Sequence, residues 1–151
     1  MRSSDVDEVI RIIRLHDSDD AKEARRYFDG GPASSGDPRH GHLVCIDPDD
    51  DTVIGVSGWD ADDGEGQGVF WLGWTYVNPF QEGRGAGRLL LGAVLAYVRE
   101  LSGRRLFLDT SSLPKYERAV RFYERNGFAR EGQLKDYYGP GDDKVLMGLT
   151  L

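Results

Sequence analysis

The sequence predicts a single α/β (α+β) domain, in which a mixed, mostly antiparallel sheet of about six strands is flanked by about four helices. Three observations lead to this prediction. The 151 residues are about the length of one ordinary domain. Segments with helical periodicity and segments with strand character are mixed along the chain. No repeat or linker divides it, so we expect residues 1–151 to form one domain.

The first half of the sequence is expected to form two helices followed by a β-hairpin. Apolar residues recur at helical spacing over residues 5–16, and a shorter helix is expected over 19–28, before a cluster of glycine, proline and serine. Residues 42–46 and 52–59 are β-branched or apolar runs joined by an aspartate-rich turn. They should therefore pair as two antiparallel strands.

The second half predicts an alternation of strands and helices. Residues 69–77 are rich in aromatic and β-branched side chains, which predicts a buried strand in the middle of the sheet. The other expected elements are a helix over 85–101, a strand over 105–109, a helix over 115–126, and strands over 128–137 and 145–151.

Composition excludes several classes of protein. The formal net charge of −7 gives no basic footprint for a nucleic-acid backbone, so no nucleic-acid partner is expected. Cys45 is the single cysteine, which rules out an intramolecular disulfide and fits a cytoplasmic protein. The N-terminal segment lacks the apolar core of a signal peptide, and the longest apolar stretch is far too short to span a bilayer, so we expect no membrane association.

The most informative segment runs from the end of the predicted central strand, at Val77, through Gly83-Arg84-Gly85-Ala86-Gly87-Arg88 into a helix. Glycines let several backbone N–H groups converge on one point, and the helix N-terminus adds positive charge, which together suit a pyrophosphate. Arg84 and Arg88 could add cationic contacts to the same ligand. A P-loop would need Lys and Ser/Thr after Gly87, and a dinucleotide fingerprint would need glycine in place of Arg88, so both alternatives fail.

This segment resembles motif A of the GNAT acyltransferases, Gln/Arg-x-x-Gly-x-Gly/Ala after a Val-x-Pro turn. Glu82 stands at the first motif position, where the family has Gln or Arg. A second segment, from Tyr116 through Ala119 and Phe122-Tyr123 to Asn126-Gly127-Phe128, is similar to a late helix of the same family, in which Tyr116 replaces the usual Asn. The resemblance covers nearly the whole chain from Asp5. It implies a first strand before the first helix, but only four residues precede Asp5, so that strand should be missing, shortened or truncated.

The resemblance also implies a cofactor and its site. Acetyl-CoA would bind as cosubstrate, with its pyrophosphate on the loop Gly83, Arg84, Gly85, Ala86, Gly87 and Arg88. Backbone amides near Tyr76 and Val77 would pair with the pantetheine arm, and Tyr116 takes the place of a residue that contacts the cofactor in the family. Tyr123 would donate a proton to the departing thiol. Its helical spacing with Tyr116, Ala119 and Val120 is also that of a core residue, so we favour the catalytic role only because both motifs are present.

The remaining roles stay open at this level. Candidates for the general base are Glu82, Asp60, Asp109 and the phenol of Tyr76, or a chain of water molecules. The histidines lack the spacing of metal ligands, so no metal is expected.

The leading hypothesis is an N-acetyltransferase acting on a primary amine of a small molecule or peptide. The alternative is a non-catalytic module that binds or senses acyl-CoA, and an acyl donor longer than acetyl is a third possibility. The acceptor should be bound by the first two helices and by the loops 30–41 and 60–68. Exposed strands also leave homodimerisation open.

Overall fold

The computed structural model describes residues 1–30, 36–62, 64 and 67–151. The loops expected to bind the acceptor, 30–41 and 60–68, fall partly outside these described residues. Among them, the chain forms helices α1 (Val6–His16), α2 (Ser18–Gly30), α3 (Ala86–Glu100) and α4 (Glu117–Arg125), and strands β1 (His40–Ile46), β2 (Val53–Ala61), β3 (Val69–Val77), β4 (Arg105–Ser111), β5 (Ala129–Gly139) and β6 (Asp142–Thr150).

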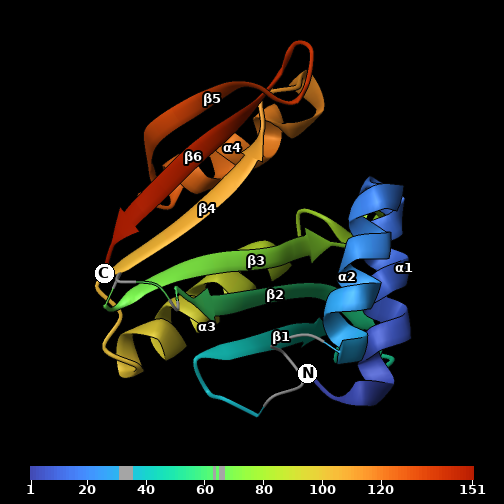
Figure 1. The fold of residues 1–151 in the computed structure, drawn as a ribbon. Coiled ribbons are helices and arrows are strands. Elements are labelled where there is room, and N and C mark those ends of the chain that lie inside the picture. The colour runs from blue at the N-terminus through green and yellow to red at the C-terminus, as the bar shows by residue number, and fades with distance from the viewer. Residues whose placement is uncertain (31–35, 63, 65–66) are drawn as a thin grey trace.

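Six strands of the described chain form one sheet in the order β1-β2-β3-β4-β6-β5. All neighbouring strands are antiparallel except β3 and β4, which are parallel. The parallel pairing is short: Val69, Phe70 and Trp71 pair with residues 105–107, and no further pair of described residues follows. Figure 1 shows the consequence. Strands β4, β6 and β5 separate from β1, β2 and β3, and the separation widens toward the C-terminal end of β3.

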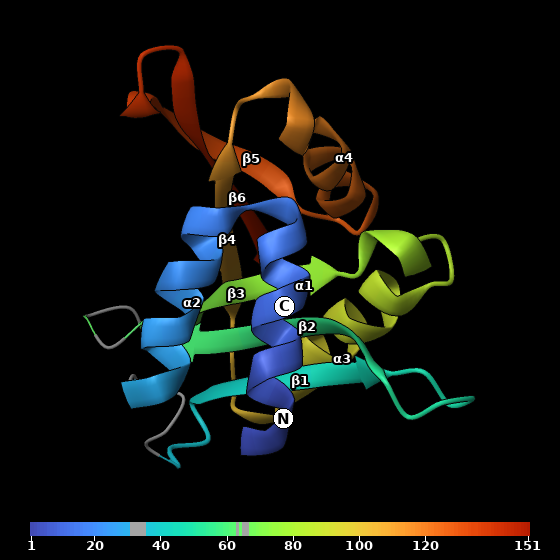
Figure 2. The same ribbon diagram turned by 90° about the vertical axis from the view of Figure 1, so that its right-hand side faces the viewer.

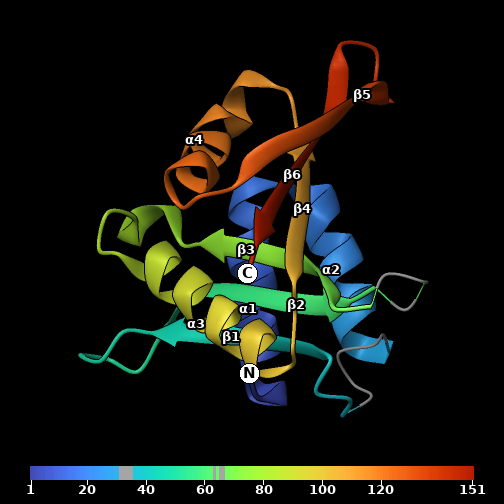
Figure 3. The same ribbon diagram turned by 90° about the vertical axis from the view of Figure 1, so that its left-hand side faces the viewer.

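Helices cover the two faces of the sheet. Helices α1 and α2 lie on one face of β1, β2 and β3, and α3 lies on the opposite face (Figures 2 and 3). The apolar stripe of α1, which includes Ile10 and Ile13, packs with Val56 of β2 in one core cluster. Leu91, Val94 and Val98 of α3 join a second, larger cluster that also contains residues of β3, β4, β6 and α4. These cores fix the ends of α1, α3 and α4 around the gap between β3 and β4.

The predicted architecture is confirmed, including the mixed sheet and the four helices. The strand predicted over 69–77 forms with those bounds, and the other elements differ by a few residues at their ends. As expected, no strand of the described residues precedes α1: residues 3–5 form a 3₁₀ turn that leads directly into this helix. The terminal ammonium of Met1 donates a hydrogen bond to the carbonyl of His42 on β1 at 2.9 Å. Every helix in the described residues is too short or too polar to cross a bilayer.

Candidate active site

A cleft of about 700 Å³ opens where β3 and β4 diverge. Its walls come from the C-terminal end of α1, the later residues of β3 and β4, the glycine loop with the first turn of α3, and the helix α4. Because β4 no longer pairs with β3 beyond Trp71, the described edge of β3 that faces the cleft keeps backbone groups available for another partner. The divergence therefore creates both the space and a row of hydrogen-bonding groups along one wall.

The glycine loop forms one end of this cleft. Gly83 and Gly85 have φ of +81° and +87°, a region that other residues adopt only with strain. Gly85 is the N-cap of α3, and the first intrahelical bond runs from the amide of Leu89 to the Gly85 carbonyl at 3.0 Å. The amides of Ala86 and Gly87 consequently have no acceptor within the helix. Free amides and the positive end of a helix dipole are together suited to an anionic ligand.

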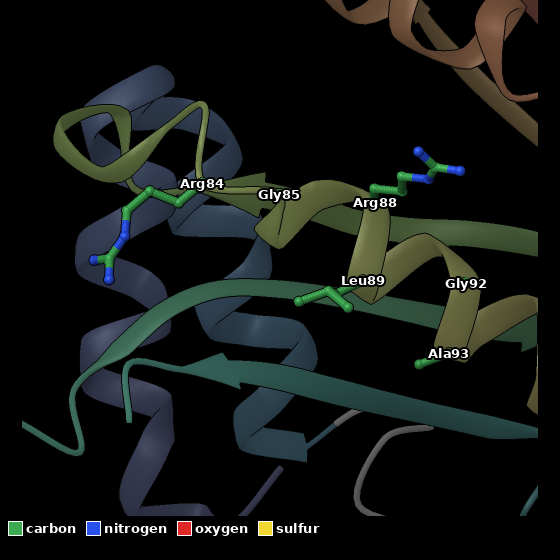
Figure 4. Close-up of a pocket in the computed structure, with 6 residues that line it drawn as sticks. All are labelled: Arg84, Gly85, Arg88, Leu89, Gly92 and Ala93. Carbon is green, nitrogen blue, oxygen red and sulfur yellow. The ribbon is translucent and has the colours of Figure 1, made fainter. Parts of the chain in front are cut away.

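The two arginines of this segment point in opposite directions (Figure 4). Arg88 lies on the first turn of α3 and lines the cleft. Nη1 of Arg84 instead donates a hydrogen bond to the buried carboxylate of Asp47 at 2.5 Å, and among the described residues Arg84 is absent from the cleft wall. The expectation that both guanidinium groups contact one ligand stays a prediction, because Arg84 is paired with Asp47 while both arginines line a second, open pocket at the start of α3.

Strand β3 contains a bulge next to the cleft. Val56 of β2 pairs with Tyr76 and Gly58 pairs with Gly73, so Ser57 alone faces both Trp74 and Thr75. Trp74 has a φ of +47°, which is unfavourable for a bulky side chain. Bulges with such strain are frequent beside active sites, where they redirect a side chain or a backbone group.

Tyr76 and Val77, the residues expected to pair with a pantetheine arm, both line the cleft. The Val77 carbonyl already has a partner, because it lies 2.7 Å from Nε2 of His16 at the end of α1. The phenol of Tyr76 donates a hydrogen bond to Asp20 of α2. Burial, followed by this hydrogen bond, raises the pKa of Tyr76 well above its ordinary value. Its phenol therefore stays protonated at neutral pH and is unsuited to be the general base.

Tyr123 lies in the wall of the cleft and in the hydrophobic core at the same time. Its ring packs edge-on against Phe122 and Phe128, and the residue is only 8% exposed. Burial raises its pKa to about 12, and a hydrogen bond with Thr75 acts in the opposite direction. The two interpretations of the helical spacing are therefore compatible. The core holds the ring, and the hydroxyl remains protonated at neutral pH beside the cleft.

Tyr116 also lines the cleft, at the residue before α4. Its hydroxyl donates a hydrogen bond to Asp17 at 3.3 Å, and Nζ of Lys115 lies 4.7 Å from the centre of its ring. Lys115 in turn pairs with Asp17 at 3.1 Å. These contacts tie α4 to the corner between α1 and α2 across the cleft mouth.

The four candidates for the general base occupy different places. Asp60 accepts hydrogen bonds from Tyr27 and His40 and does not belong to the described cleft wall. Glu82 and Asp109 do line the cleft. Glu82 forms an ion pair with Arg118 of α4, and Asp109 accepts a hydrogen bond from Tyr138 at 2.5 Å and pairs with Lys144 at 3.2 Å. Tyr76 lines the cleft as well but stays protonated, so Glu82 and Asp109 remain as the candidate side chains among the described residues of the cleft.

Some residues of the cleft carried no signal in the sequence. His16, Thr75 and Arg118 belong to its wall, although neither motif includes a functional role for them. Their positions depend on the α1 terminus, the bulge of β3 and the docking of α4, none of which a local pattern reveals. Among the described residues, no group of three or more His, Cys, Asp or Glu side chains is arranged to hold a metal ion.

The chain as a whole is similar to several solved structures. A crystal structure of a GNAT-family protein from Desulfovibrio desulfuricans has a TM-score of 0.88 and 30% identity, covering 99% of this chain and 94% of that one. The yncA protein of Salmonella typhimurium, solved with acetyl-CoA, has a TM-score of 0.79 and 19% identity, covering 100% and 91%. An aminoglycoside 6′-N-acetyltransferase solved with coenzyme A has a TM-score of 0.75 and 17% identity, covering 96% and 89%.

The similarity to the Salmonella protein and to the aminoglycoside acetyltransferase, at 19% and 17% identity, shows a shared fold. No curated protein sequence matches the chain. The sequence model of the acetyltransferase (GNAT) family matches residues 8–128, which include the glycine loop and α4. The protein therefore belongs to the GNAT acetyltransferase family.

Proposed function

We propose that this protein is an acetyl-CoA-dependent N-acetyltransferase that transfers an acetyl group to a primary amine of a small molecule or peptide. The observation that carries the proposal is the cleft between β3 and β4. The glycine loop and helix N-terminus lie in its wall together with the hydroxyl-bearing residue Tyr123. A ligand with an anionic end and a reactive thioester end would match that arrangement.

The residues of the cleft fit acetyl-CoA. The amides at the start of α3 and the guanidinium of Arg88 would bind its diphosphate. The cleft edge of β3 at Tyr76 and Val77 would hydrogen-bond its pantetheine arm. The bound cosubstrate supplies a thioester, whose acyl carbon is open to attack by an amine. Two of the similar solved structures contain acetyl-CoA or coenzyme A, which supports this assignment.

The chain's own residues have two tasks in such a transfer. Tyr123, protonated at neutral pH, would donate its proton to the sulfur as the thiolate leaves. Backbone N–H groups of the strained bulge around Trp74 would stabilise negative charge on the carbonyl oxygen. The proton of the attacking amine would leave through Glu82, Asp109 or water, and the acceptor would enter from the side of α1 and α2.

The test begins with calorimetric titration of the protein with acetyl-CoA, coenzyme A and NAD. We expect binding of both CoA species and none of NAD. Thiol release from acetyl-CoA is then measured with a panel of amines, including an aminoglycoside and a peptide with a free N-terminus. Turnover of at least one amine, reduced at least tenfold in Tyr123→Phe, would support the proposal. CoA binding without thiol release would indicate a sensing module, and absence of CoA binding would refute both.

A further inference from the structure

Asp17 lies at the corner between α1 and α2, and its two carboxylate oxygens bind different parts of the molecule. Oδ1 accepts hydrogen bonds from the amides of Asp19 and Asp20, at 2.9 and 3.2 Å, and so caps the start of α2. Oδ2 accepts hydrogen bonds from Nζ of Lys115 at 3.1 Å and from the hydroxyl of Tyr116 at 3.3 Å. One side chain therefore joins the α1–α2 corner to the segment that leads into α4.

The two segments that Asp17 joins belong to the two walls of the cleft that diverge. The α1–α2 corner is fixed to β3, because Nε2 of His16 donates a hydrogen bond to the carbonyl of Val77 at 2.7 Å. Lys115 and Tyr116 also line the cleft, but they follow β4 in the chain. The contacts of Asp17 therefore span the opening that the divergence of β3 and β4 creates.

The segment before α4 depends on such contacts, because the core does not hold it. Residues 114–116 form a 3₁₀ turn in which no residue is buried, whereas Val120 and Tyr123, further along α4, belong to the core. Among the described residues, the pairing of β3 with β4 ends at Trp71. Beyond that point the distance between the two walls depends on side-chain contacts across the cleft, and Asp17 makes two of them.

We infer that Asp17 is a positioning residue for the cosubstrate: it holds Lys115 and Tyr116 against the α1–α2 corner, so that the cleft closes over the arm of a bound acyl-CoA. The inference rests on the proposed function, in which that arm lies along β3. Asp17 is not part of the described cleft wall, so it acts through the two residues that it binds.

The contact is also able to open. The side chains of Lys115 and Asp17 are 53% and 23% exposed, and ion pairs with such exposure stabilise a fold only slightly. The walls can therefore separate to admit the arm and to release coenzyme A after transfer. A closure of this kind acts mainly on the dissociation rate of the ligand, because it forms after the ligand has bound.

A second ion pair, between Glu82 and Arg118, joins α4 to the glycine loop, but its loss has a different expected effect. Glu82 lines the cleft beside the proposed diphosphate site, where its charge repels the ligand. Asp17 lies outside the described cleft wall, and Lys115 compensates its charge. Removal of a negative charge should therefore strengthen binding at Glu82 and weaken it at Asp17. Electrostatic repulsion alone would give the same sign at both positions.

Surface plasmon resonance with immobilised protein measures the association and dissociation rates of coenzyme A. Asp17→Asn keeps a side-chain oxygen for the amides of α2 but loses the ion pair. We expect coenzyme A to dissociate from it about fivefold faster, with little change in association. Lys115→Met should have a similar effect from the other wall, and Tyr116→Phe a smaller one of about twofold. The double variant Asp17→Asn/Lys115→Met should release the ligand no faster than either single variant, because both changes break the same contact.

Lys22→Met is the matched control. Lys22 pairs with Asp19 at 2.6 Å in α2, and it is not part of the described cleft wall. This variant loses a comparable surface ion pair near the same corner, so it should leave the dissociation rate unchanged. Melting temperatures are measured for all variants, and Asp17→Asn should lose no more stability than Lys22→Met. With any amine that reacts, Asp17→Asn should raise KM for acetyl-CoA and not lower kcat.

The outcomes separate this inference from the proposed function. If the parent protein does not bind coenzyme A, both fail together. If the parent binds but Asp17→Asn releases the ligand at the parent's rate, or binds it more tightly, the positioning role is overturned and the proposed function stands. Fully additive effects of Asp17→Asn and Lys115→Met, or an equal effect of Lys22→Met, would also refute the inference, because the cause would then be overall charge or stability.

Discussion

Nη1 of Arg84 donates a hydrogen bond to Oδ2 of Asp47 at 2.5 Å, joining the glycine loop to the turn after β1. Asp47 is buried, and it also accepts a hydrogen bond from the amide of Asp49 at 3.2 Å. The hydrogen bond from Arg84 lowers the pKa of Asp47 below its ordinary value. Arg84 therefore holds the glycine loop against the turn after β1, while Arg88 remains available to a ligand.

The two arginines should respond differently to substitution. Arg88→Gln is expected to weaken coenzyme A binding about fivefold, because an exposed guanidinium contact to phosphate is lost. Arg84→Gln should leave the affinity within about twofold of the parent but lower the melting temperature. Calorimetric titration and thermal unfolding of both variants make the comparison. A larger loss of affinity in Arg84→Gln than in Arg88→Gln would contradict the geometry.

Gly85→Ala should weaken the anion seat. The backbone at Gly85 has a φ of +87°, and a Cβ there would meet no described atom within 4 Å, so the cost is conformational strain of about 1–2 kcal/mol. Relief of this strain would move the first amides of α3, and we expect coenzyme A affinity to fall about tenfold.

Gly92→Ala is the matched control for that variant. Gly92 is exposed in the interior of α3, and a Cβ there likewise meets no described atom within 4 Å. It should raise the free energy of unfolding by about 0.5–1 kcal/mol and leave binding unchanged. Equal affinities for the two variants would show that the conformation of Gly85 is irrelevant to the ligand.

The sequence predicts the backbone of the site better than its side chains. The glycine loop and the strand over 69–77 follow from local rules: alternating glycines before an apolar helix, and a run of β-branched and aromatic residues. The direction of Arg84 does not, because Asp47, its partner, is 37 positions away. A long-range partner leaves no trace in the pattern around the loop.

Two other features of the site also depend on tertiary context. The aromatic run of β3 gives no sign that Trp74 takes a positive φ, since bulky residues rarely do so. The divergence of β3 and β4 after Trp71 is not marked by a proline in either strand.

Glu82→Gln should strengthen coenzyme A binding. Glu82 lines the cleft beside the glycine loop and forms an ion pair with Arg118. Removal of its charge lessens repulsion of a diphosphate and releases Arg118, so we expect the affinity to rise about threefold at low salt. In about 0.5 M salt the gain should disappear.

Glu117→Gln provides the control, because Glu117 forms a comparable ion pair with Arg121 on α4 and is not part of the described cleft wall. That variant should bind coenzyme A like the parent. Weaker binding by Glu82→Gln would mean that the carboxylate helps to form the ligand site, and unchanged binding would contradict the predicted repulsion. The same variant tests Glu82 as general base, since a base would lower kcat at least a hundredfold when neutralised.

His42 should make the fold sensitive to mild acid. Both ring nitrogens are buried without a hydrogen-bond partner among the described residues, and the ring packs edge-on against Tyr27 and Phe28. Burial lowers the pKa of His42 to about 4, from an ordinary value of 6.5. The folded state thus resists protonation that the unfolded state accepts below about pH 6.5.

The sign follows from proton binding: the unfolded chain binds more protons between these two pKa values, so stability falls as the pH falls from about 6.5 to 4. The full contribution of His42 to this loss is about 3 kcal/mol, and it levels off below pH 4. His42→Leu removes the titrating group at similar volume. Urea unfolding of both proteins between pH 4 and 7.5 should give curves that converge in slope above pH 6.5 and separate below it. If the two curves are parallel over the whole range, His42 binds a proton as readily in the folded protein as in the unfolded chain, and the prediction is wrong.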